Sequence, residues 1–272
     1  MQNAIGKMAF EGILTHPMTG RIMEKPRTYG KTVCSDLGLS LAEVQNVISN
    51  CAPYIDRVKI AFGTGVIYSE DYLKAKLAAY HNANIVTNTG GTIGEIAFMQ
   101  GKYDEFLEQC KQLGFTAIEI SDGTIQLSDD DRCRMIEKVM KMGFECCTEV
   151  GKKMEDEQLE MKEAIRQIKR DLSLGVSTCT VESRGSAKGV GVFDKNGKVK
   201  ADDVEEMMAA GIDPKRLTWE APTKDGQEFF INYFGINVNL ANVRVNEVIA
   251  LEGLRCGLRG DTLAKIVRGL VQ

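Results

Sequence analysis

The chain has 272 residues, of which 43% are hydrophobic and 26% are charged, and its formal net charge is −4. This composition is typical of a soluble globular protein, and the acidic balance argues against nucleic acid or an anionic membrane surface as the main partner. No apolar run is long enough to span a bilayer, and the N-terminus lacks a basic-then-apolar leader, so we expect a cytoplasmic protein.

The cysteines and histidines limit which metal-binding and acid–base residues the protein can use. The eight cysteines form no C-x-x-C pair and have no histidine at zinc-binding spacing. Several lie in apolar segments, where cysteine behaves as a small hydrophobic side chain, so we expect them to be reduced. Only His16 and His81 are present, and we therefore expect another residue type to perform general acid–base chemistry.

Residues 1–30 are polar and irregular, and we expect them to form an N-terminal arm packed on the outside of the protein. From residue 31 to 272, apolar segments that are typical of strands alternate with helical patterns. The first helical pattern follows a capping box at Ser40-Leu-Ala-Glu43. Eight strands are predicted, at residues 32–35, 54–62, 84–89, 116–121, 145–150, 177–183, 216–222 and 237–243.

Eight strands alternating with eight helices predict a (β/α)8 TIM barrel, with a doubly wound open sheet as the alternative. No change of composition marks a linker, so residues 31–272 are expected to form a single domain with a C-terminal extension. The glycine- and lysine-rich residues 185–200 interrupt the alternation after the sixth strand, and Asn196-Gly197 fits a two-residue hairpin turn. We hypothesise that this segment is a mobile cover over the site.

Charged and amide residues recur near the ends of the predicted strands. Side chains alternate between the two faces of a strand, and in five strands one face is apolar while the other carries such a residue. The apolar face should contact the helices. The other face then points into the barrel near its C-terminal mouth, and it carries Lys59, Glu119, Glu149, Glu182, Glu220 and Asn239.

The negative charge of four carboxylates at one mouth must be compensated. Two of them about 8 Å apart repel by roughly 2 kcal/mol at an effective dielectric near 20, and six such pairs give roughly 12 kcal/mol. That is comparable with a domain stability of about 5–15 kcal/mol. Lys59, Lys153 and Arg184 supply some positive charge, and Mg²⁺ bound by Glu119, Glu182 and Glu220 is expected to supply the rest. The alternative is a mouth without metal, compensated by salt bridges or partial protonation.

Three further segments are typical of anion binding or acid–base chemistry. In Glu149-Val-Gly-Lys-Lys153, a carboxylate, a glycine turn and two lysines end an apolar run. Gly90-Gly91-Thr92 follows the third strand, where backbone N–H groups ahead of a helix favour an anion, although a simple tight turn explains it equally well. Arg184 and Ser186 follow Glu182 as additional candidates.

Together these motifs resemble the phosphosulfolactate synthase family. The resemblance runs in register from about residue 27 to residue 262 and includes Ile118-Glu-Ile-Ser-Asp-Gly-Thr124, Glu149-Val-Gly-Lys-Lys153, Trp219-Glu-Ala-Pro222 and Asn237-Val-Asn-Leu-Ala-Asn242. It implies a (β/α)8 barrel that adds sulfite to phosphoenolpyruvate with Mg²⁺ and yields (2R)-phospho-3-sulfolactate. Such an enzyme is a carbon–sulfur lyase run in the synthetic direction, at an early step toward coenzyme M or sulfolactate.

The resemblance also implies residue roles. The second lysine of the E-V-G-x-K motif, Lys153, corresponds to the general acid, and Lys59 and Glu149 are its expected catalytic partners. The expected substrate-binding residues are Gly90, Gly91, Thr92, Ser121, Arg184, Ser186 and Asn239. A homo-oligomer is also expected.

The chain departs from the family pattern around the expected pocket. Members often have W-G-T-S where this chain has Phe62-Gly-Thr-Gly65, and E-x-R-E-S where it has Gly185. These changes bear on the nucleophile, so a paralogue that uses another nucleophile on a phosphorylated enol acid is one alternative. Another is a non-catalytic barrel, because the resemblance extends to plant heat-stress-associated proteins. The lysines and glutamates that are present favour the enzyme.

Overall fold

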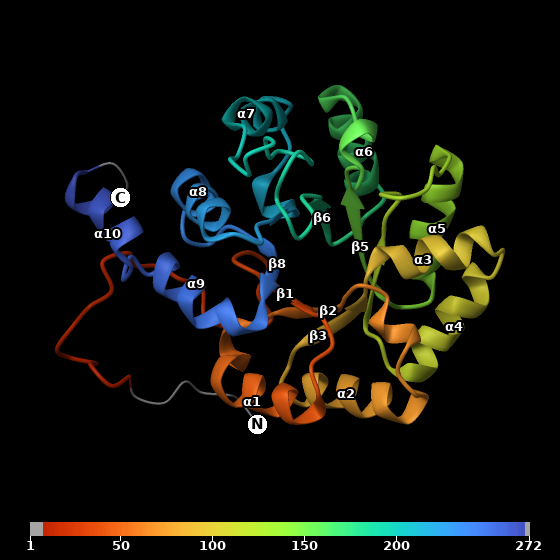
Figure 1. The fold of residues 1–272 in the computed structure, drawn as a ribbon, viewed down its shortest axis with the longest axis horizontal. Helices are drawn as coiled ribbons and strands as arrows, with labels where there is room; N and C mark the ends of the chain where they lie inside the picture. The colour runs from red at the N-terminus through yellow and green to blue at the C-terminus, as the bar shows by residue number, and fades with distance from the viewer. Residues whose placement is uncertain (1–7, 270–272) are drawn as a thin grey trace.

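The structure, a computed structural model, describes residues 8–269 and contains a closed barrel of eight parallel strands paired in chain order (Figure 1). The first and last strands pair with each other and close the barrel. This confirms the predicted (β/α)8 TIM barrel. The strands are β1 (Thr32–Asp36), β2 (Arg57–Ile60), β3 (Val86–Thr89), β4 (Ala117–Ile120), β5 (Glu145–Val150), β6 (Thr178–Val181), β7 (Leu217–Glu220) and β8 (Leu240–Arg244).

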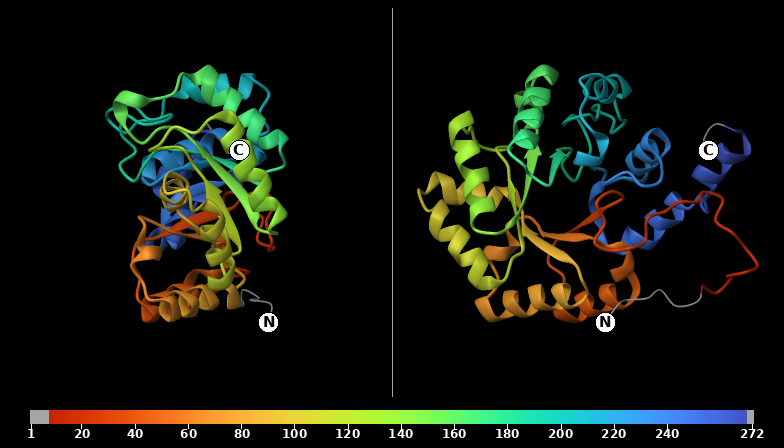
Figure 2. Two further views of the ribbon diagram at one scale, coloured as in Figure 1. Left: turned by 90° about the vertical axis from the view of Figure 1, so that its right-hand side faces the viewer. Right: turned by 180° about the vertical axis from the view of Figure 1, so that it is seen from behind.

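Helices surround the barrel on its outer side (Figure 2). They are α1 (Leu41–Cys51), α2 (Glu70–Asn82), α3 (Gly91–Met99), α4 (Tyr103–Leu113), α5 (Asp129–Lys141), α6 (Met161–Ser173), α7 (Ala201–Ala209), α8 (Lys224–Phe234), α9 (Val248–Arg255) and α10 (Gly260–Val267). The capping box of Ser40 and Glu43 is present at the start of α1. None of the helices described is long and apolar enough to cross a membrane.

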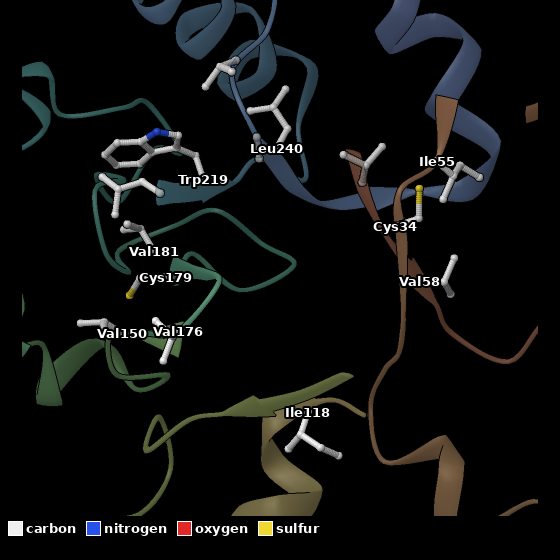
Figure 3. Packing of buried hydrophobic residues seen from close by; sticks show 14 of the residues in the cluster. Cys34, Ile55, Val58, Ile118, Val150, Val176, Cys179, Val181, Trp219 and Leu240 are labelled. Atoms are coloured by element: carbon white, nitrogen blue, oxygen red, sulfur yellow. The ribbon is translucent and has the colours of Figure 1, made fainter. Parts of the chain in front are cut away.

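The hydrophobic core lies between the strands and the helices. Val58, Ile118, Cys179, Trp219 and Leu240 belong to it and are fully buried (Figure 3). These side chains occupy the faces that were predicted to contact the helix layer. The predicted alternation is therefore correct for these strands, and the opposite faces point into the barrel.

The structure corrects some element boundaries. β3 is followed by two helices, α3 and α4, where the sequence predicted one. The second strand is shorter than the predicted 54–62 at both ends. Tyr54 belongs to a 3₁₀ turn, Ala52–Tyr54, and Phe62 has a left-handed φ of 53°, which is incompatible with a strand.

The predicted arm of residues 1–30 begins outside the described residues, which start at Met8. From there to Lys31 the chain contains no helix or strand. This stretch contacts the outside of the barrel: the Met18 N–H donates to the Cys256 carbonyl, and Arg21 forms an ion pair of 2.8 Å with Glu252. Figures 1 and 2 show this stretch beside α9 and α10.

Residues 185–200 differ from the predicted two-residue hairpin. Phe193 and Val199 form one antiparallel bridge with five residues between them. The Asp194 N–H donates to the Lys198 carbonyl inside this bridge, which leaves a three-residue loop that ends at Gly197, with φ at 83°. The Asp194 carboxylate accepts N–H groups within this loop, from Asn196 and Lys198. Val190, Val192 and Phe193 are buried, so the middle of this segment is attached to the hydrophobic core.

Candidate active site

A cavity of about 650 Å³ opens at the C-terminal ends of the strands. TIM barrels place their active sites at this end, because the loops that follow the strands converge there. The cavity contains eleven of the predicted site residues: Lys59, Gly90, Gly91, Thr92, Glu119, Glu149, Lys153, Glu182, Arg184, Ser186 and Glu220.

Lys59 joins three of the carboxylates. Its Nζ lies 2.9 Å from Glu119 Oε1, 3.1 Å from Glu149 Oε2 and 3.6 Å from Glu220 Oε1. These residues come from β2, β4, β5 and β7, so one ammonium group connects four strands. Burial by itself lowers the pKa of Lys59, but the carboxylates outweigh burial and hold this pKa well above its ordinary value.

A second ammonium group, that of Lys153, contacts two carboxylates of this cluster. Its Nζ lies 2.5 Å from both Glu149 Oε1 and Glu182 Oε2. Burial lowers the pKa of Lys153, but Glu149 and Glu182 raise it by more, so the side chain is a stable ammonium. Lys152 points away from the cavity and donates to the Asp122 carbonyl at 2.5 Å. The structure thus confirms that the second lysine of the pair faces the site.

The carboxylates differ in the direction in which their pKa values are shifted. Burial is the main cause that raises the pKa of Glu119, to about 6, against the opposing charge of Lys59. Burial, with the nearby charges of Glu149 and Glu220, holds the pKa of Glu182 well above its usual range. Glu149 is also buried, but Lys153 and Lys59 hold its pKa well below the ordinary value. Within one cluster, the pKa is thus raised at Glu119 and Glu182 and lowered at Glu149.

The donor set fits Mg²⁺ only if the substrate supplies further ligands. Among residues 8–269, no group of three or more His, Cys, Asp or Glu side chains is arranged to hold a metal ion. Glu119, Glu182 and Glu220 therefore do not form the predicted three-carboxylate site on their own. Magnesium is commonly bound by one or two carboxylates together with water and substrate oxygens, and these oxygen donors fit that mode.

The start of α3 is partly occupied by a protein carboxylate. The Gly91 N–H donates to Glu119 Oε1 at 3.0 Å, and the Gly90 N–H donates to the Ile60 carbonyl at 3.2 Å. One interpretation of the sequence was that these two N–H groups bind an external anion. In the structure both already donate to groups of the protein and are not free for that role. A side chain at Gly91 would place its Cβ 2.4 Å from Ser121 Cβ, so glycine is required for this close approach.

Two predicted substrate-binding residues are found in supporting positions. Ser121 is buried outside the cavity lining, where its hydroxyl donates to Glu149 Oε1 at 3.0 Å and orients that carboxylate. Arg184 lies exposed at the rim with a left-handed φ of 58°. Its N–H donates to Glu182 Oε1 at 2.6 Å, and its guanidinium donates to the Lys153 carbonyl at 3.0 Å.

The prediction that Asn239 lies at this mouth is wrong. Asn239 precedes β8 and is buried at the N-terminal end of the barrel. Its side chain accepts from the Lys31 N–H and donates to the Lys215 and Leu217 carbonyls. The alternation gave the correct face of the chain, but the position along the barrel axis depends on how β8 is staggered against its neighbours.

Ser35 and Asn242 line the cavity but were not predicted as site residues. Ser35 lies one residue before the end of β1 and is small, so nothing in its local sequence distinguished it. Asn242 belongs to the Asn237-Val-Asn-Leu-Ala-Asn242 motif that carried part of the family resemblance. That motif was the one signal that could have identified it.

Comparison with known proteins identifies the family of this chain. Residues 20–261 match the model of the family described as (2R)-phospho-3-sulfolactate synthase (ComA). The chain belongs to this family. The match covers β1 to β8 and every residue that lines the cavity.

Curated relatives of this phosphosulfolactate synthase family span almost the same length. The chain is 44% identical to a phosphosulfolactate synthase from Methanocaldococcus jannaschii over 239 residues, which cover 87% of this chain and 95% of that protein. It is 35% identical to a phosphosulfolactate synthase from Methanothermobacter thermautotrophicus, and the match covers 93% of this chain and 97% of that protein. A more distant relative is protein HEAT-STRESS-ASSOCIATED 32 from Arabidopsis thaliana, at 22% identity over 85% of this chain and 87% of that protein.

Solved structures support the fold alone. The family member resembles the putative copper homeostasis protein CutC from Streptococcus agalactiae with a TM-score of 0.54 and 11% identity, covering 79% of this chain and 99% of that one. It also resembles 3-keto-L-gulonate-6-phosphate decarboxylase from Vibrio cholerae with a TM-score of 0.53 and 14% identity. This match covers 88% of this chain and 98% of that one. At such identities the chemistry is argued from the cavity itself.

Proposed function

We propose that this protein is a phosphosulfolactate synthase that adds sulfite to phosphoenolpyruvate in the presence of Mg²⁺ and forms (2R)-phospho-3-sulfolactate. The observation that carries the proposal is the placement of two ammonium groups, Lys59 and Lys153, among carboxylates in one cavity of a chain that belongs to this family. The reaction is that of a carbon–sulfur lyase in the synthetic direction.

The addition creates negative charge that the cavity must stabilise. The sulfur of sulfite forms a bond to C3 of phosphoenolpyruvate, and the electron pair of the C2–C3 double bond moves to C2 and into the carboxylate. Lys59 is placed at the centre of the cavity, where a fixed ammonium stabilises such a developing aci-enolate. Mg²⁺, when bound by one or two of the carboxylates and by substrate oxygens, supplies further positive charge there.

Lys153 is the proposed donor of the proton that completes the product at C2. Its pKa is raised by Glu149 and Glu182, so it is protonated before substrate binds. The carbanionic carbon of an aci-enolate is a much stronger base than a carboxylate, and it can therefore accept a proton that the two glutamates leave on the lysine. The ammonium also stabilises the enolate before the transfer.

The direct test is an incubation of the protein with phosphoenolpyruvate, sulfite and Mg²⁺, followed by mass spectrometry. A sulfonated, phosphorylated three-carbon acid is the expected product, and its formation should stop when EDTA exceeds the metal. Absence of this product with folded protein contradicts the proposal. Consumption of phosphoenolpyruvate only with a different nucleophile would favour the paralogue, and full activity in EDTA would exclude the metal.

We also propose that the protein acts in the cytoplasm as a homo-oligomer. Large apolar side chains are exposed on the N-terminal stretch, among them Phe10, Ile13 and Leu14, and such side chains are more often covered in an assembly. Size-exclusion chromatography with light scattering tests the association, and a monomer at micromolar concentration would contradict it. Cell fractionation tests the location.

A further inference from the structure

The β1 and β8 side of the cavity carries an uncharged polar pair to which no role has been given. The Ser35 hydroxyl donates to Asn242 Oδ1 at 3.0 Å, and both residues line the cavity. Ser35 comes from β1 and Asn242 from β8, which are paired in the barrel. Lys153 follows β5, and β5 lies four strands from β1 in the closed order. The pair is therefore across the mouth from the proposed proton donor.

A bulge in β8 turns Asn242 toward the cavity. Leu240 pairs with Thr32 and Val243 pairs with Cys34, so β8 has one more residue than β1 over this interval. Leu240 and Val243 both belong to the hydrophobic core, although residues three apart in a regular strand lie on opposite faces. Asn242 lies within the bulge at a φ of 57°. Bulges often re-aim side chains beside active sites, and Asn is one of the few residues other than glycine that readily adopt the left-handed conformation.

The hydrogen bond from Ser35 leaves the other end of the amide available. Asn242 Nδ2 donates to none of the residues that the structure describes, and Asn242 is only half-buried. Asn242 lines the cavity, and because Ser35 holds Oδ1, the NH₂ group is the end of the amide that is left for a ligand. This part of the wall therefore offers a neutral hydrogen-bond donor with a fixed orientation.

A neutral donor suits one of the two proposed substrates better than the other. The phosphate and carboxylate of phosphoenolpyruvate are best held by charged groups, such as Lys59 and Arg184, since charge-assisted hydrogen bonds are the stronger ones. Sulfite must be held through its oxygens while its sulfur lone pair stays nucleophilic. A neutral amide can bind those oxygens with little withdrawal of electron density from the sulfur, whereas an adjacent ammonium would withdraw more and weaken the nucleophile.

We infer that Asn242 binds oxygens of sulfite and that Ser35 orients the Asn242 amide for this contact. This inference rests on the proposed function. Sulfite held by Asn242 forms its sulfur–carbon bond at C3 from the β1 and β8 side, the π electrons move to C2, and the Lys153 ammonium supplies the proton from the opposite side. Asn242 is then a substrate-binding residue, and Ser35 is a positioning residue that acts through it.

The central variant is Asn242→Gly, which removes the amide but suits the left-handed backbone, so the fold is retained. The matched control is Asn84→Gly: Asn84 also has a left-handed φ, 56°, but is exposed between α2 and β3, at the other end of the barrel. We expect Asn242→Gly to raise KM for sulfite by about 10- to 100-fold, the effect of losing one hydrogen bond to a charged ligand. KM for phosphoenolpyruvate should change less than about twofold, and Asn84→Gly should change neither constant.

Ser35→Ala tests the positioning role. We expect a smaller rise in KM for sulfite, of about threefold to tenfold, and the double variant should be no worse than Asn242→Gly because both changes remove the same contact. Additive effects of the two substitutions would overturn the role of Ser35. Formation of product by the wild type with an unchanged KM for sulfite in Asn242→Gly would overturn the inference, as would a rise confined to phosphoenolpyruvate. Failure of the wild type to form product would instead refute the proposed function.

Discussion

The two ends of this barrel both contain ion pairs, but they differ in the ratio of cations to carboxylates. At the N-terminal end, Arg57 pairs with Glu145 at 3.0 Å, and Arg27 pairs with Asp56 at 3.0 Å. Asn239 satisfies three backbone groups at the same end. At the C-terminal mouth, two lysines are shared by four glutamates around a cavity.

The difference indicates which end performs chemistry. At the N-terminal end the carboxylates are matched by at least as many cations and by further hydrogen bonds. Glu145 also lies 3.9 Å from Lys31 Nζ and accepts from the Ser177 hydroxyl. Asp56 accepts from the Thr32 N–H, so these carboxylates leave nothing for a ligand to complete. A cluster with more carboxylates than cations has unbalanced charge and perturbed pKa values, and such clusters are typical of functional sites. The following predictions test this contrast between a structural end and a reactive end.

The largest effect is expected for Lys153→Met. Removing a general acid usually lowers the rate by about 10²–10⁴, so turnover of phosphoenolpyruvate with sulfite should fall by at least that factor. The protein should still fold and bind phosphoenolpyruvate, which circular dichroism and calorimetry measure separately from turnover.

Lys152→Met is the control for this substitution. Lys152 is adjacent in sequence but donates to the Asp122 and Ile125 carbonyls outside the cavity. We expect a modest loss of stability, about 1–3 kcal/mol, and a much smaller loss of turnover. If Lys152→Met is the inactive variant, or Lys153→Met retains near-normal turnover, the assignment of the acid is wrong.

The next effect concerns the metal requirement. Glu220→Gln keeps the size of the side chain but removes a carboxylate, so the Mg²⁺ concentration for half-maximal rate should rise by about tenfold or more. Glu145→Gln, at the N-terminal end, should leave that concentration unchanged. Titration of activity with Mg²⁺ after EDTA treatment measures both, and equal responses of the two variants would remove Glu220 from the proposed metal site.

Asn239→Ala should affect stability and leave catalysis intact. Loss of its side chain leaves the buried Leu217 carbonyl without this donor, together with the less buried Lys31 N–H and Lys215 carbonyl, so we expect the free energy of unfolding to fall by about 1–3 kcal/mol. Urea denaturation measures this change. The value of kcat/KM, measured where the variant is fully folded, should stay within about twofold; a large loss would return Asn239 to the active site.

The smallest effect is expected in the segment after β6. Arg184 lies at the cavity rim, whereas Lys195 lies at the far tip of a loop held by the buried Val192 and Phe193. If the segment covers bound substrate, phosphoenolpyruvate should slow tryptic cleavage after Arg184 severalfold and leave cleavage after Lys195 unchanged. Identical digestion with and without phosphoenolpyruvate would refute the idea of a cover.

Local sequence was sufficient to predict much of this architecture. The period of two along a strand is a property of the backbone, so it assigned Lys59, Glu119, Glu149, Glu182 and Glu220 to the inner face without knowledge of their neighbours. The same local rule, with the family motif, distinguished Lys153 from Lys152. Strand and helix periodicity predicted the (β/α)8 order for the same reason.

Position along the barrel axis and local breaks in the alternation were decided only by tertiary structure. Asn239 has an inward-facing position but lies at the wrong end, because the stagger of β8 is set by pairing with β1, some 200 residues earlier. Asn242 faces the cavity because of a bulge that exists only in that pairing. The pairing of each carboxylate with Lys59 or Lys153 likewise depends on distances across the closed mouth. Those distances are set by strands that are remote in sequence.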